Sequence, residues 1–108
     1  MSKQKFIEVS EKCKKTMRTS PVSQVIALKG RKPTRGAILS NQIACEIYRD
    51  DLRALAEEVE NDRKLNDSTE PEPDVTTIFY ESLLSVINRE IFDIEKIIES
   101  LKDLKFNL

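Results

Sequence analysis

The last third of the chain, residues 76–108, carries the feature that most constrains the fold. Its apolar side chains recur at alternating intervals of four and three residues, which places them on one face of an α-helix. Lys105 alone breaks a series that otherwise consists of Tyr80, Leu84, Ile87, Ile91, Ile94, Ile98, Leu101 and Leu108. No Gly or Pro interrupts the segment, so it is predicted to form one helix about 45 Å long at 1.5 Å per residue.

The middle of the chain, residues 37–65, is predicted to form the helix that packs against this seam. One apolar stripe with helical spacing consists of Ile38, Cys45, Tyr48, Leu52, Leu55 and Val59. A second stripe, confined to the first half of the segment, consists of Leu39, Ile43 and Ile47. Two stripes indicate neighbours on two sides, so we expect the N-terminal elements to surround this half. The later acidic residues Glu57, Glu58, Glu60 and Asp62 are expected on a solvated face.

The N-terminal part divides at Ser20-Pro21, a pair suited to the start of a helix. Before it, residues 2–19 are predicted to form a short basic helix, with an apolar face of Phe6, Val9, Cys13 and Met17. After it, residues 22–29 either form a second helix, with Gly30 in the left-handed conformation behind it, or pair with residues 37–39 as a β-hairpin. A lone hairpin is marginally stable, which favours the helix.

Residues 66–74 contain two prolines and no apolar residue, and are predicted to be a flexible acidic linker with Asp74 as the N-cap of the last helix. The predicted fold is therefore all-α. It is a single domain, a small three- to four-helix bundle built on a coiled-coil-like antiparallel pair of long helices. Its parts are residues 1–36 (basic helix and loop), 37–65 (central helix), 66–74 (linker) and 75–108 (C-terminal helix).

The sequence contains no recognisable set of catalytic residues, and we expect no enzyme activity, cofactor, metal site or small-molecule substrate. It contains no histidine, and its two cysteines, Cys13 and Cys45, lie far apart on predicted apolar faces. Adjacent carboxylates such as Asp50 and Asp51 diverge by about 100° on a helix and suit a solvated face. There is no apolar N-terminal segment and no run of 18 apolar residues, so an intracellular location in cytoplasm or nucleus, away from membranes, is expected.

The C-terminal helix has more apolar surface than one partner helix covers. This excess predicts an oligomer or a complex with another protein, through Phe79, Leu83, Val86, Phe92, Ile97 and Leu104. Of these, Phe79, Val86 and Phe92 are interpreted as one separate side. The predicted function is a non-enzymatic protein–protein interaction subunit, such as an adaptor, small chaperone or assembly component.

The distribution of charge along the sequence supports an alternative hypothesis, in which the partner is anionic. Residues 1–36 hold ten basic and two acidic residues, a net charge of +8, whereas residues 37–108 hold eight basic and seventeen acidic residues, a net charge of −9. This separation indicates either internal pairing or an anionic partner. The candidate anion-binding residues are Lys12, Lys15, Arg18, Lys29, Arg31, Lys32 and Arg35. The alternative function is therefore nucleic-acid binding through residues 3–35.

Overall fold

The computed structural model describes residues 2–30, 32–69 and 75–106, and it is helical almost throughout. The four helices are α1 (Ser2–Met17), α2 (Val22–Lys29), α3 (Arg35–Thr69) and α4 (Val75–Phe106). No strand occurs in the described ranges. The predicted all-α bundle is confirmed, and residues 22–29 are a helix rather than half of a hairpin.

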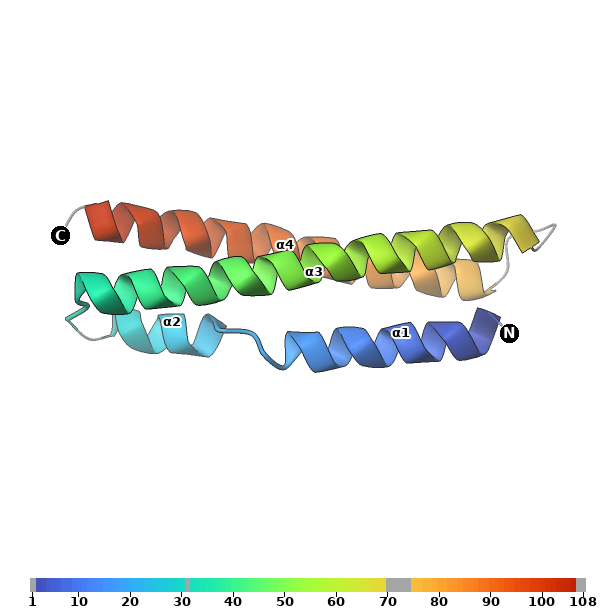
Figure 1. The fold of residues 1–108 in the computed structure, drawn as a ribbon, viewed down its shortest axis with the longest axis horizontal. Helices are drawn as coiled ribbons and strands as arrows, with labels where there is room; N and C mark the ends of the chain where they lie inside the picture. Colours follow the sequence, from blue (N-terminus) through green and yellow to red (C-terminus); the bar gives the residue numbers. More distant parts are fainter. Residues whose placement is uncertain (1, 31, 70–74, 107–108) are drawn as a thin grey trace.

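The two long helices α3 and α4 run antiparallel along the whole molecule, which measures 57 × 19 × 16 Å. The short helices α1 and α2 follow one another along the same side of this pair and together form a third layer (Figure 1). The start of α1 therefore lies near the end of α3 and the start of α4, whereas the end of α2 and the start of α3 lie at the opposite end, near the end of α4 (Figure 1).

The core consists of the stripes that the spacing predicted. The α3 stripe is buried from Ile38 to Val59, with Gln42 filling the turn between Ile38 and Cys45. From α4, the buried seam residues are Tyr80, Ile87, Ile94, Ile98 and Leu101, with Leu84 and Ile91 partly buried beside them. The third layer contributes Val9, Cys13 and Val25. Lys105 is half-buried, and Leu108 lies outside the described residues.

The second stripe of the central helix is not buried, contrary to the prediction. Leu39 is 43% exposed, Ile43 48% and Ile47 58%. The reason is that α1 and α2 both lie on one side of α3 (Figure 1), where Gln24, Ala27 and Leu28 of α2 line a hollow together with Asn41. The outer side of α3 therefore has no neighbour among the described residues.

Three element boundaries also differ from the prediction. Gly30 has φ −82° rather than a left-handed conformation, so it follows α2 without needing the freedom of glycine. Thr34 Oγ1 accepts a hydrogen bond from the Ala37 amide at 3.1 Å, and this N-cap starts α3 at Arg35. At its other end α3 continues to Thr69, so residues 66–69 are helix and not linker. Residues 70–74, including the predicted N-cap Asp74, lie outside the described ranges.

Replacing Ile94 by Ala tests the central seam. Ile94 is 1% exposed, and removing such a side chain leaves a cavity that costs about 2–5 kcal/mol of unfolding free energy. Urea denaturation followed by circular dichroism measures this loss. The control is Phe92→Ala on the same turn, where a 54% exposed ring predicts a much smaller change. Equal losses in the two variants would contradict this assignment of the buried face.

Candidate functional site

The flank of α4 that faces α1 and α2 is largely covered within the chain. The Phe79 ring stacks on Phe6 of α1, with 5.7 Å between centroids and an interplanar angle of 27°. Leu83, Ile97 and Leu104 are partly buried against the core. Of the candidate partner-binding residues on this flank, only Val86 and the outer edge of Phe79 remain about half exposed. The surface available to a partner here is smaller than the sequence indicated.

Phe92 does not share a side with Phe79 and Val86. Thirteen residues of helix turn Phe92 roughly 140° away from Phe79 at 3.6 residues per turn. Phe92 lies in a shallow hollow whose lining includes Glu95 and Ser100, and Lys96 Nζ sits 4.3 Å from its ring centroid. A cation over the ring stabilises this exposed aromatic without burying it. The candidate residues on α4 therefore form two surfaces rather than one.

The outer stripe of α3 is the larger apolar surface. Leu39, Ile43 and Ile47 follow at intervals of four residues on one helix face, each about half exposed. The spacing of these side chains predicted that they belong to the core. The residue pattern of an apolar helix face is the same whether or not a neighbouring helix covers it. No signal within the chain distinguishes the two cases.

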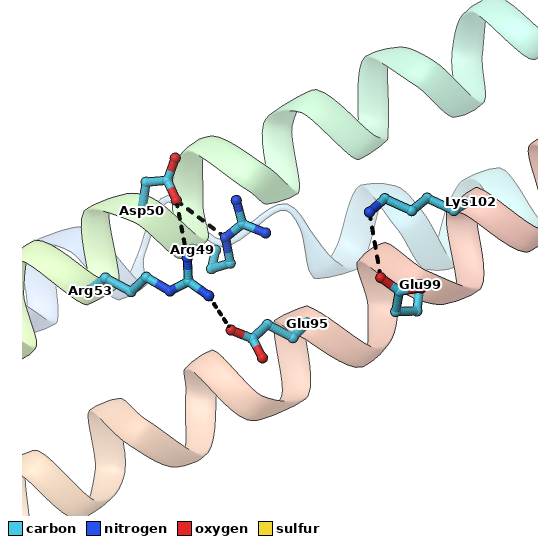
Figure 2. A network of polar contacts seen from close by, with 6 residues as sticks. All are labelled: Arg49, Asp50, Arg53, Glu95, Glu99 and Lys102. Carbon is cyan, nitrogen blue, oxygen red and sulfur yellow. Dashed lines mark hydrogen bonds and ion pairs between the residues drawn. The ribbon is translucent and has the colours of Figure 1, made fainter.

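The side of the α3–α4 pair opposite the third layer is polar. Arg53 of α3 reaches Glu95 of α4, with Nη2 and Oε1 2.6 Å apart, and Arg49 and Arg53 both approach Asp50 (Figure 2). On α4, Lys102 pairs with Glu99 at 3.5 Å. These ion pairs border the hollow of Phe92, whose lining also includes Glu95 and Glu99.

Part of the basic N-terminal charge is used inside the molecule. Lys5 Nζ lies 3.3 Å from Asp62 Oδ1, and Lys12 Nζ lies 2.9 Å from Glu58 Oε1. The hydrogen bond to Glu58, followed by its charge, raises the pKa of Lys12. Asp62 was expected on the solvated face, but it is buried, because α1 covers this part of α3. Pairing with carboxylates of α3 therefore accounts for two charges of the basic third.

The remaining candidate anion-binding residues do not form one patch. Lys15 and Arg18 are exposed at the end of α1, near the middle of the molecule, whereas Lys29, Lys32 and Arg35 flank the α2–α3 connection at one end (Figure 1). Arg31 lies outside the described residues.

The end that carries the α2–α3 connection also receives the last turns of α4. Lys29 Nζ donates to Ser100 Oγ at 2.8 Å, and Pro33 lies in a hollow with Leu104. The antiparallel topology therefore adds the basic residues Lys102 and Lys105 of α4 to this end.

The cysteine thiols are the strongest nucleophiles among the side chains of this chain. Cys13 and Cys45 are both buried, and burial is the main cause that raises the pKa of each thiol. A raised pKa keeps a thiol in its unreactive protonated form. No group of three or more potential metal ligands occurs among the described residues. Within the same ranges, none of the helices is long and apolar enough to cross a bilayer.

Comparison with known protein families, with curated proteins and with solved structures finds no match to this chain.

The two tyrosines of the chain predict a loss of stability at high pH. The Tyr48 hydroxyl donates to Glu90 Oε1 at 3.1 Å. Burial, with the Glu90 charge adding to it, raises the pKa of Tyr48 to about 12. Burial and then Asp62 raise the pKa of Tyr80. Both tyrosines have a higher pKa in the folded state than in the unfolded state. The stability that they give to the folded state is therefore fully present below pH about 10 and is lost as the pH rises further.

Absorbance of the phenolate in the native protein measures this effect. We expect both tyrosines to ionise above the pH at which they ionise in urea, and Glu90→Gln to lower the pKa of Tyr48 alone. Native ionisation of both groups near pH 10 would contradict the burial of these hydroxyls.

Proposed function

We propose that the protein is a non-enzymatic interaction subunit, a small helical bundle that binds another protein through exposed apolar helix surfaces. The observation that carries this proposal is the stripe of Leu39, Ile43 and Ile47 on the outside of α3. Single exposed apolar side chains are ordinary, whereas a row of them on one helix face is typical of an interaction site.

The spacing of the stripe supports a helical mode of binding. Side chains at intervals of four residues form a ridge that packs into the grooves of a second helix. Ile26 on α2 is also exposed, and it provides a comparison because it lies on a different helix. The two smaller apolar surfaces on α4, at Val86 and at Phe92, are secondary candidates for the same function.

Substitution of the stripe tests the proposal. The double variant Ile43→Asp/Ile47→Asp should keep the helical spectrum and the unfolding midpoint, because both side chains are already exposed, but should lose association at least tenfold. The measurements are sedimentation equilibrium for self-association and quantitative cross-linking in the native source for a second protein. The control Ile26→Asp introduces an aspartate at another exposed isoleucine and should leave association unchanged.

The same experiment on Phe92→Asp and Val86→Asp separates the α4 surfaces from the stripe. A wild-type protein that stays monomeric and cross-links to nothing, or losses that are equal in all variants, would refute the proposal.

A second candidate function is binding of nucleic acid at the basic end. The observation in its favour is that Lys32 and Arg35 are exposed and make no ion pair among the described residues, in a region where α4 adds Lys102 and Lys105. No aromatic side chain is interleaved with them in sequence, so the contacts would be to phosphates and not to bases.

Salt dependence distinguishes this candidate. Four phosphate contacts predict that affinity for duplex DNA falls about a hundredfold between 50 and 200 mM salt. Lys32→Ala/Arg35→Ala should abolish binding, whereas Lys14→Ala/Arg89→Ala, which removes the same charge elsewhere, should preserve it. Fluorescence anisotropy with a labelled duplex measures both. Equal effects of the two double variants would exclude a site at the basic end.

A further inference from the structure

Helix α1 depends on its contacts with the rest of the protein. It has 16 residues and no acidic residue in its first turn. That turn instead contains Lys5, so the positive end of the helix dipole meets positive charge. Isolated helices of this length are marginal in water. The helix therefore persists only while it is docked on α3 and α4.

The docked face of α1 is small. Val9 and Cys13 are buried, and Phe6 packs edge-on against Tyr80 of α4, with 5.2 Å between centroids and an interplanar angle of 82°. Phe6 also stacks on Phe79. Few apolar side chains thus hold the helix, whereas the seam between α3 and α4 is buried independently of α1 along the other half of the molecule.

Two ion pairs supply the rest of the attachment. Lys5 and Lys12 lie two turns apart on α1, and they contact Asp62 and Glu58, one turn apart on α3. The Asp62 side chain is only 8% exposed, and its Oδ2 is buried without a hydrogen bond. The lysines are more than half exposed, so salt weakens their attraction.

The site beneath α1 is an apolar groove with an acidic edge. Its floor includes Phe79 and Tyr80 of α4, and Glu58 and Asp62 of α3 form its edge. It fits an amphipathic helix with lysine or arginine on one flank, which is the character of α1 itself. The short segment between Met17 and Val22 separates α1 from α2, and α2 is attached on its own through Val25 and Lys29.

We propose that α1 is a releasable cover. It undocks as a unit while α3 and α4 stay folded, and it exposes a groove that binds a basic amphipathic helix of a partner protein in its place. This inference rests on the proposed function as an interaction subunit, because it supplies that subunit with a second surface, one that is closed until α1 leaves.

The two cysteines provide matched reporters of this release. Cys13 is on α1 and Cys45 is on α3, and both are buried and unpaired. They are the only cysteines in the chain. A thiol reagent therefore labels Cys13 at the rate set by undocking of α1, and Cys45 at the rate set by opening of the central bundle.

The first experiment compares two double variants of the full chain. Lys5→Gln/Lys12→Gln removes the attachment, whereas the control Lys14→Gln/Lys15→Gln removes equal charge from α1, where Lys14 pairs with Glu11 of the same helix. We expect labelling of Cys13 to rise at least tenfold in the first variant and less than twofold in the control. Labelling of Cys45 should not change.

Equal labelling of both cysteines in the wild-type protein and the variants, at the rate of global unfolding, would overturn the proposal. Should the first variant unfold globally, the wild-type protein decides the matter. Between 50 and 500 mM NaCl its Cys13 labelling must rise while that of Cys45 stays constant, and a constant ratio refutes release of α1.

The second experiment measures binding to the uncovered groove. The probe is a fluorescent peptide of residues 2–19 with Cys13→Ser, added to the full-length protein. It should bind Lys5→Gln/Lys12→Gln at least tenfold more tightly than wild type, and Glu58→Gln/Asp62→Asn in that background should remove binding. Absence of binding to a variant with released α1 would refute the groove as a docking site. That failure leaves the α3 stripe, which is tested by association of Ile43 and Ile47 variants, unaffected.

Discussion

Burial of the apolar seam between α3 and α4 is the interaction on which the other elements depend. The two long helices contribute eleven buried apolar side chains to this core, among them Tyr48 and Leu52 of α3 and Ile98 and Leu101 of α4. At about 1.5–3 kcal/mol for each large apolar side chain removed from water, it is the main stabilising term of the fold. Neither α1 nor α2 is long enough to persist alone, so both form on a surface that the seam has already assembled.

The third layer is short because the chain breaks it at Pro21, and this has consequences for the surface. Two short helices placed end to end cover one side of the α3–α4 pair (Figure 1). The opposite side carries charged side chains, with Arg53 and Glu95 paired across it (Figure 2). The outer stripe of α3 belongs to neither side. It is exposed because the described part of the chain has no further helix to cover it. A partner could therefore reach it.

The sequence predicted the fold class and the core because a 4-3 repeat identifies a buried helix face directly. It failed for Leu39, Ile43 and Ile47 because periodicity shows that a face is apolar, not that a neighbour exists to cover it. Asp62 was missed for the converse reason: a carboxylate in an acidic segment looks solvated until α1 is placed over it. The separation of Phe92 from Phe79 was predictable, since helical geometry alone places them on different sides of α4.

The charge of the N-terminal third was treated as one feature in the sequence, but it has two roles that divide at Pro21. Before this residue, Lys5 and Lys12 face carboxylates on α3, and their energetic effect is largest where one member, Asp62, has been removed from water. After it, Lys32 and Arg35 lie at the far end of the molecule and face solvent. The first group attaches a helix to the protein's own core, and the second remains available to an external anion. Internal complementarity and an anionic partner are thus compatible explanations, because they apply to different lysines and arginines.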